Sequence, residues 1–223
     1  MNGQELLVCV HGFLRTHRNM SRIEKAFETC GWEVVNWGYP SREKRIEEHA
    51  EDLIEMLQAI AKRRPGLPIH FITHSLGGII VRAALNHPDC PEEAKRGKAV
   101  LIAPPNQGAI FARKLKNYPF FRWILGDYAG AELMDFTNFQ HLGPFPPTKK
   151  VLVIAGNLGF NPFIKESNDG KVAVKETFLN TPHEHCVVGA GHSWISLSPK
   201  VIRVAKAFLF ESGQTFRDDG REP

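Results

Sequence analysis

The chain has 223 residues, of which 43% are hydrophobic and 23% are charged, and its formal net charge is +4. These values are ordinary for a globular domain and give a chain of this length enough apolar residues for one substantial core. The small positive charge comes without any nucleic-acid-binding motif, so nucleic acid is excluded as an expected partner and at most weak contact with an anionic membrane surface is predicted.

The cysteines and the N-terminal segment indicate the class of protein. Four cysteines occur without a disulfide framework or the spacing of a metal site. No basic stretch followed by a long apolar run begins the chain, and no run is long enough to span a membrane. We therefore expect a cytoplasmic protein without a bound metal. Calcium binding and the oligomeric state stay open.

Apolar runs alternate with stretches of helical periodicity along the chain. The predicted strands are residues 5–10, 32–36, 68–73, 98–103, 150–155 and 184–188, and the predicted helices are about 18–29, about 43–63, 76–87 and 199–211. This order predicts an α/β fold with a mostly parallel central sheet and helices on both faces. One domain over residues 1–211 and a disordered tail over 212–223 are expected.

The first predicted strand ends in His11-Gly12-Phe13, at the edge where parallel sheets bind ligands. Gly12 lets the backbone approach a ligand closely, so the N–H of Phe13 is our candidate donor to an oxyanion, with Leu14 as the alternative. Leu14 is also a candidate substrate contact. His11 is interpreted as a polar strand-end residue that orders this loop.

The stretch Thr73-His74-Ser75-Leu76-Gly77-Gly78 joins a predicted strand to a predicted helix. A serine on such a turn is typical of a nucleophile elbow, in which Ser75 should have a positive φ angle and the N–H of Leu76 should be an oxyanion donor. Thr73 replaces the first glycine of the usual G-x-S-x-G pattern, and an ordinary turn is the alternative. His74, next to the nucleophile, is interpreted as a packing or orienting residue and is also a candidate substrate contact.

Residues 104–148 separate two predicted strands and are rich in aromatic and basic residues. One hypothesis is a lid or pocket wall that accepts an acyl chain, with Phe111 touching the substrate. The alternative is one amphipathic helix packed on the sheet, followed by a loop.

A carboxylate that orients a catalytic histidine should follow the nucleophile in the chain. Asp169, in Asn168-Asp169-Gly170, lies between a strong strand and a late histidine and is the main candidate. A surface turn is the alternative, since Asn-Asp-Gly favours turns. The other candidate carboxylates are Glu166, Glu176, Glu184 and Asp135.

The candidate base is His192, on a glycine-rich loop after the last predicted strand, with Trp194 beside it as a candidate substrate contact. His183 and His185 are rivals, and with Cys186 they could imitate a metal site, but no second ligand cluster supports this. The triad would then run Ser75, Asp169, His192 along the chain.

These motifs, together with the loop from Ala103 to Gly108, resemble the α/β-hydrolase superfamily and more closely its small bacterial lipase and esterase branch. The resemblance implies a serine hydrolase that cleaves small-molecule or lipid carboxylic esters through an acyl-enzyme, without a cofactor. An acyltransferase, thioesterase or lipid deacylase with the same triad is the alternative, and so is a non-catalytic module of the same fold.

Overall fold

The computed structural model describes residues 5–116, 118–135 and 138–210, so the predicted tail lies outside the described part of the chain. Its centre is a six-stranded sheet in the order β2-β1-β3-β4-β5-β6, in which every neighbouring pair is parallel. The strands are β1 (Leu6–Val10), β2 (Glu33–Trp37), β3 (Ile69–His74), β4 (Gly97–Ile102), β5 (Lys149–Gly156) and β6 (Glu184–Val188). The predicted parallel sheet is confirmed.

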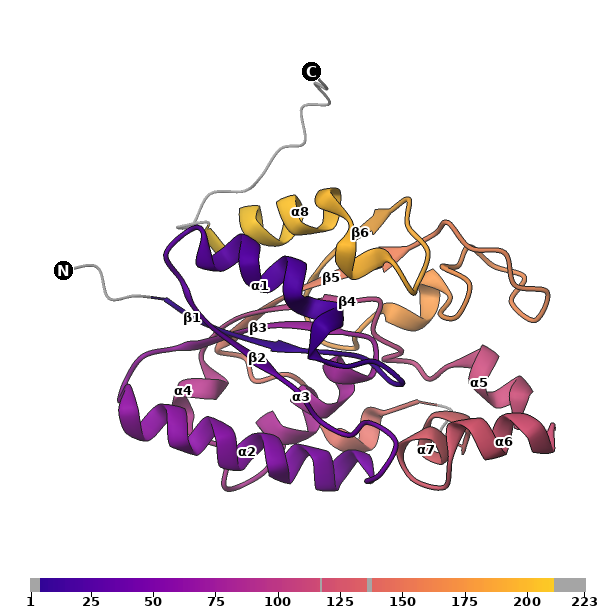
Figure 1. Ribbon diagram of the computed structural model, residues 1–223, viewed down its shortest axis with the longest axis horizontal. Coiled ribbons are helices and arrows are strands. Elements are labelled where there is room, and N and C mark those ends of the chain that lie inside the picture. The colour runs from indigo at the N-terminus through magenta and orange to yellow at the C-terminus, as the bar shows by residue number, and fades with distance from the viewer. Residues whose placement is uncertain (1–4, 117, 136–137, 211–223) are drawn as a thin grey trace, which may run out of the picture.

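Helices cover both faces of this sheet (Figure 1). Helices α1 and α8 lie on one face, and α2, α3 and α4 lie on the other. Their bounds are α1 (Ser21–Glu28), α2 (Ile46–Arg63), α3 (Leu76–Asn86), α4 (Glu92–Lys95) and α8 (Pro199–Phe210). The helix predicted over 18–29 is divided, because a 3-10 turn at His17–Met20 precedes α1.

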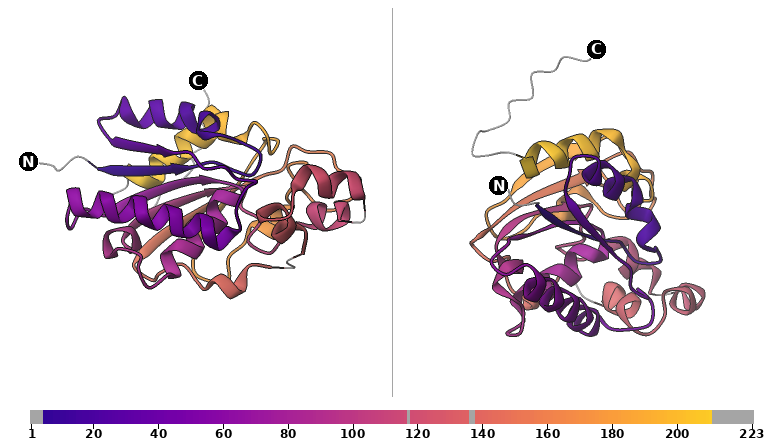
Figure 2. Two further views of the ribbon diagram at one scale, coloured as in Figure 1. Left: turned by 60° about the horizontal axis from the view of Figure 1, so that its bottom comes forward. Right: turned by 60° about the vertical axis from the view of Figure 1, so that its left-hand side comes forward.

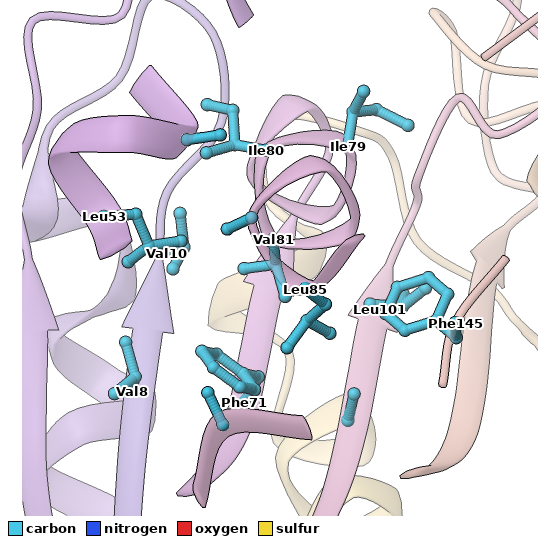
Figure 3. Close-up of a cluster of buried hydrophobic side chains, with 14 of the residues drawn as sticks. Val8, Val10, Leu53, Phe71, Ile79, Ile80, Val81, Leu85, Leu101 and Phe145 are labelled. Carbon is cyan, nitrogen blue, oxygen red and sulfur yellow. The ribbon is translucent and has the colours of Figure 1, made fainter. Parts of the chain in front are cut away.

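The two layers bury alternate side chains of the same strands. Leu6, Val8 and Val10 of β1 belong to the core under α2 and α3, whereas Leu7 and Cys9 belong to the core under α1 and α8. Figure 3 shows part of the first core, where side chains of β1, β3 and β4 meet those of α2 and α3. Both faces are apolar because both are covered, which explains the unbroken hydrophobic runs in the sequence.

The described residues of 104–148 form three short helices rather than the single amphipathic helix of our alternative hypothesis. They are α5 (Ile110–Leu115), α6 (Pro119–Leu125) and α7 (Ala129–Asp135), followed by a 3-10 turn at Gln140–Leu142. Local sequence explains both ends of α6. The helix begins at Pro119, and proline suits the first turn of a helix, while Gly126 just after it adopts a φ of +79°, which favours glycine and ends the helix. These helices project beyond one end of the sheet (Figure 2).

Two sequence-based expectations concern the membrane and the cysteines. Among the described helices, none combines the length and the apolar character that crossing a bilayer requires.

Cys9, Cys30, Cys90 and Cys186 are all free thiols. Burial raises the pKa of Cys90 to about 11, so this thiol stays protonated and packs as a small apolar side chain.

Candidate active site

Ser75 occupies a sharp turn between the end of β3 and the start of α3. Its φ of +50° lies in the left-handed region, as predicted for a nucleophile elbow. The turn presses α3 against the end of β1, since a Cβ on Gly77 would lie 2.5 Å from the carbonyl oxygen of Val10. Only glycine fits there, which ties the serine turn to the loop that follows β1.

Thr73, which departs from the usual elbow pattern, is accommodated by a second glycine. Its side chain is fully buried, and a Cβ added to Gly78 would lie 3.1 Å from its Oγ1 atom. The glycine on the first turn of α3 therefore leaves the space that the threonine occupies. Because Thr73 and Gly78 face each other, the bulk that the threonine adds is matched by the side chain that Gly78 lacks.

The structure brings Ser75, His192 and Asp169 together in a hydrogen-bonded chain. The Ser75 Oγ atom lies 3.1 Å from Nε2 of His192, and Nδ1 of His192 lies 2.7 Å from Oδ2 of Asp169. The Asp169 side chain is 1% exposed and that of His192 is 8% exposed. With Nδ1–H donating to the carboxylate, Nε2 is left free to accept the serine proton.

The Asp169 carboxylate is held by its own turn. Its Oδ1 atom accepts the backbone N–H groups of Lys171 at 3.0 Å and Val172 at 2.8 Å, which leaves Oδ2 for His192. The Asp169 carbonyl also accepts the backbone N–H of His192 at 2.8 Å. The predicted Asn-Asp-Gly turn is thus present, and the same turn presents the carboxylate to the histidine.

Two glycines that the sequence analysis missed support this turn. A Cβ on Gly159 would lie 1.9 Å from the backbone nitrogen of Gly170, and one on Gly156 would lie 2.8 Å from Cβ of Asp169. The loop after β5 is therefore pressed against the Asp169 turn. The only sequence signal was the presence of two glycines just after a strand, which is too common to identify a site.

The rival carboxylates lie elsewhere. Glu166 pairs with Lys175, and Asp135 pairs with Lys116 at 2.5 Å. Glu176 is buried and accepts the backbone N–H groups of Ala173 and Ile110 at 2.8 and 2.5 Å. Glu184 is exposed at the start of β6. None of them is hydrogen-bonded to His192 in the described part of the chain.

The loop after β1 places the candidate oxyanion donors. The N–H of Leu14 donates to Oγ of Ser41 at 3.0 Å, whereas those of Phe13 and Leu76 make no hydrogen bond to a described residue. This difference favours Phe13 over Leu14 as the second donor. His11 lies beneath the loop, stacked on Tyr39 with the ring centroids 4.2 Å apart.

His11 orders this loop through both ring nitrogens. Its Nδ1–H donates to the carbonyl oxygen of Gly12 at 2.9 Å, and its Nε2 accepts the backbone N–H of Tyr39 at 3.2 Å. Burial lowers the pKa of His11, which keeps the ring in this neutral form. The structural interpretation given to His11 from the sequence agrees with these contacts.

His74 lies behind His192 and supports it. Its Nε2 atom lies 3.1 Å from the carbonyl oxygen of His192, and the two rings are 5.0 Å apart. Burial and the neighbouring His192 hold the pKa of His74 well below its usual range, so the ring is neutral and its Nε2–H donates. This geometry matches an orienting role.

The metal-site alternative finds no support in the described residues, where no group of three or more histidine, cysteine, aspartate or glutamate side chains could hold an ion. His185 instead stacks on Phe178 at 4.0 Å and contacts the hydroxyl of Thr177. His183 is hydrogen-bonded to the carbonyl oxygen of Thr181.

A largely apolar cavity of about 710 Å³, including its open mouth, adjoins Ser75 and His192. Residues 104–148 supply much of its wall, through Pro105, Ala109, Phe111, Ala112, Leu115, Leu125 and Leu133. The remaining lining residues are Phe13, Leu14, Arg15, His74, Ser75, Lys171, Val172 and His192. Of the predicted substrate contacts, Leu14, His74 and Phe111 line the cavity.

Trp194, the remaining predicted substrate contact, does not line this cavity. Its backbone N–H donates to the carbonyl oxygen of Gly191 in the turn that leads to the next 3-10 helix, and its side chain is 71% exposed. The turn directs the indole to solvent. Proximity in sequence to His192 therefore does not place the Trp194 side chain beside this cavity.

The sequence pattern of the hydrolase family described as serine aminopeptidase, S33, matches residues 2–130, which include the loop after β1, Ser75 and helices α5 and α6. The chain belongs to this family. The resemblance to the α/β-hydrolase superfamily inferred from the motifs is thereby confirmed. No curated protein matches the chain in sequence.

Solved structures with the same fold include three bacterial or metagenomic enzymes. The mature form of the lipase BlEst2 from Bacillus licheniformis has a TM-score of 0.76 and 18% identity, over 94% of this chain and 93% of the lipase chain. The metagenomic carboxyl esterase MGS0156 has a TM-score of 0.66 and 17% identity, over 86% of this chain and 65% of its own. The phospholipase PlaB from Legionella pneumophila has a TM-score of 0.65 and 17% identity, over 92% of this chain and 59% of its own. At such identities the similarity concerns the fold.

Proposed function

We propose that this protein is a serine hydrolase that cleaves carboxylic esters through an acyl-enzyme, with Ser75 as nucleophile, His192 as base and Asp169 as the residue that orients it. The observation that carries the proposal is the chain of hydrogen bonds from Ser75 Oγ through His192 to Asp169, at 3.1 and 2.7 Å, beside an apolar cavity. A serine alone is a weak nucleophile, and an oriented imidazole is what activates it.

In this mechanism Ser75 Oγ attacks the acyl carbon while Nε2 of His192 takes the serine proton. Asp169 stabilises the resulting imidazolium, and the N–H groups of Phe13 and Leu76 stabilise the oxyanion, each by ~3 kcal/mol of barrier. His192 then protonates the leaving alcohol, and water releases the acid by the same route in reverse. The reaction requires no metal or organic cofactor.

The lining of the cavity favours an ester over the N-terminus of a peptide, although the family description names an aminopeptidase. Recognition of a free α-ammonium group calls for an acidic side chain. The described lining residues include no carboxylate, while Arg15 and Lys171 bring positive charge. The apolar wall from residues 104–148 suits the acyl chain, and we propose that it forms the acyl pocket.

Hydrolysis of p-nitrophenyl esters from acetate to palmitate would test the proposal. We expect turnover by the wild type and its loss, by about 10⁵-fold or more, in Ser75→Ala. A phosphonate should label the wild type at Ser75 alone. The preferred chain length would measure how much of the wall of α5 and α7 contacts the acyl group.

The matched control is Ser167→Ala, which removes the hydroxyl of an exposed serine outside the cavity. This variant should hydrolyse the p-nitrophenyl esters and react with the phosphonate at wild-type rates. A folded wild-type protein that neither turns over any ester of the series nor reacts with the phosphonate would overturn the proposal.

A further inference from the structure

Two cationic side chains line the cavity beside the candidate triad. Arg15 follows the loop after β1, and Lys171 follows the turn that carries Asp169. Neither side chain makes a hydrogen bond or an ion pair with any residue that the structure describes. The Lys171 contact with Asp169 uses its backbone N–H, so the ammonium group itself is available.

Lys171 lies two residues after Asp169, the hydrogen-bond partner of His192, and Arg15 is near enough to act electrostatically on Lys171. Each is near enough to His74, which contacts His192, to lower the pKa of the His74 ring. The apolar lining comes mostly from residues 104–148. The cavity therefore has a cationic part beside the base and an apolar part formed by the three short helices.

Among the described residues, the acidic group that acts on Lys171 is the buried Asp169, which does not line the cavity. None of the described lining residues is a carboxylate, and both oxygens of Asp169 are occupied by His192 and two backbone N–H groups. The pKa of Lys171 is lowered by desolvation first and by the nearby Arg15 second, so the two cations repel each other. An anion bound between them would offset both effects.

We propose that Arg15 and Lys171 bind a phosphate or carboxylate on the leaving alcohol of the ester. The proposal rests on the ester hydrolysis proposed above. Because His192 must protonate the leaving oxygen, the alcohol half of the substrate lies beside His192, whose partner Asp169 belongs to the same turn as Lys171. A guanidinium with an ammonium group can hold an anionic oxygen cluster by charge-assisted hydrogen bonds.

The chemistry at the acyl carbon is unchanged by this recognition. A bond forms between Ser75 Oγ and the acyl carbon, the bond to the alkoxide breaks, and the serine proton passes through Nε2 of His192 to the leaving oxygen. Water then attacks the acyl carbon, the bond to Ser75 Oγ breaks, one water proton passes through Nε2 of His192 to Ser75 Oγ, and the free acid leaves. The anion on the alcohol keeps its charge throughout and serves only to position the substrate.

Short, water-soluble esters with different charge placement would test the proposal. The substrates are 1-butyrylglycerol, its 3-phosphate, the butyryl ester of glycerate, and ethyl hydrogen succinate, which carries its anion on the acyl half. We expect kcat/KM to be roughly 10- to 100-fold higher for an anionic leaving alcohol than for the neutral ester, mainly through a lower KM. The two anionic alcohols distinguish phosphate from carboxylate, and added salt should weaken the preference.

Arg15→Gln and Lys171→Gln should each reduce the ratio of anionic to neutral kcat/KM by about 10-fold, and the double variant should remove the preference. Lys171→Gln retains the backbone N–H that supports Asp169. Lys150→Gln is the matched control, because it removes one exposed charge at the other end of the sheet. Its ratio should equal that of the wild type.

The outcomes separate this inference from the function on which it rests. Turnover of p-nitrophenyl butyrate with equal kcat/KM for the neutral and anionic glycerol esters would overturn the anion site and leave the esterase intact. A stronger preference for ethyl hydrogen succinate would also overturn it, by placing the anion on the acyl side. Loss of all serine-dependent turnover would instead overturn the proposed function.

Discussion

A single methyl group at Gly77 should disrupt the packing beneath the nucleophile turn. By helix propensity alone, Gly77→Ala would stabilise α3 by ~1 kcal/mol. In the structure the added Cβ would lie 2.5 Å from the carbonyl oxygen of Val10 and 2.7 Å from that of His11. These are backbone atoms at the end of β1, so the contact is relieved only by moving a strand, at a cost of ~3 kcal/mol.

We therefore expect a net loss of about 2 kcal/mol in the free energy of unfolding. The displaced backbone also carries the loop with Phe13, and a shift of ~1 Å in an oxyanion donor lowers kcat/KM by about 100-fold. Urea unfolding followed by circular dichroism would measure the first effect, and p-nitrophenyl ester turnover would measure the second.

Gly189→Ala is the control for the added methyl group, because its Cβ would meet no atom within 4 Å. Its unfolding free energy should stay within ~0.5 kcal/mol of the wild type. A Gly77→Ala variant as stable as the wild type would refute the reasoning, since helix propensity would then outweigh the contact with β1.

Three further predictions test the triad, the pH dependence and the support of α5. Asp169→Asn should lower kcat by about 10³- to 10⁴-fold at neutral pH with little change in stability, because the amide favours the wrong tautomer of His192; an unchanged kcat would contradict the triad. Burial lowers the pKa of His70 to about 4, so between pH 6.5 and 4 the unfolded chain binds more protons and stability falls as the pH drops. Urea unfolding at pH 7 and at pH 4 would measure the fall in the free energy of unfolding, and in His70→Gln this fall should be smaller than in the wild type by up to about 3 kcal/mol. An equal fall in the wild type and the variant would show that His70 does not contribute to it. Glu176→Ala should cost ~2 kcal/mol and alter the preferred acyl length, because the carboxylate anchors the start of α5; Glu176→Gln, which keeps one acceptor, should cost less.

Local patterns predicted the elements that are buried on both sides. The strand from Leu6 to Val10 is an unbroken apolar run because two helical layers cover it, and such runs are recognisable without any knowledge of neighbours. The serine turn was equally readable, since a strand, Ser75, two glycines and a helix are adjacent in sequence and the strained φ follows from that order.

Selecting the carboxylate required the tertiary structure. Asp169 was one of five candidates, and nothing in its own turn distinguishes it from a surface Asn-Asp-Gly. What distinguishes it is the close packing of its turn against Gly156 at the end of β5 and Gly159 in the following loop, together with the hydrogen bond to His192. Contacts between segments that are distant in sequence leave no periodic signal in any one of them.

The sequence by itself determined the parallel sheet and the position of the nucleophile turn, because both follow from the order of neighbouring segments along the chain. The tertiary structure decided the shape of residues 104–148 and the charge of the cavity. Those depend on which side chains from separate loops converge, and this convergence placed Arg15 and Lys171 together while leaving Trp194 in solvent.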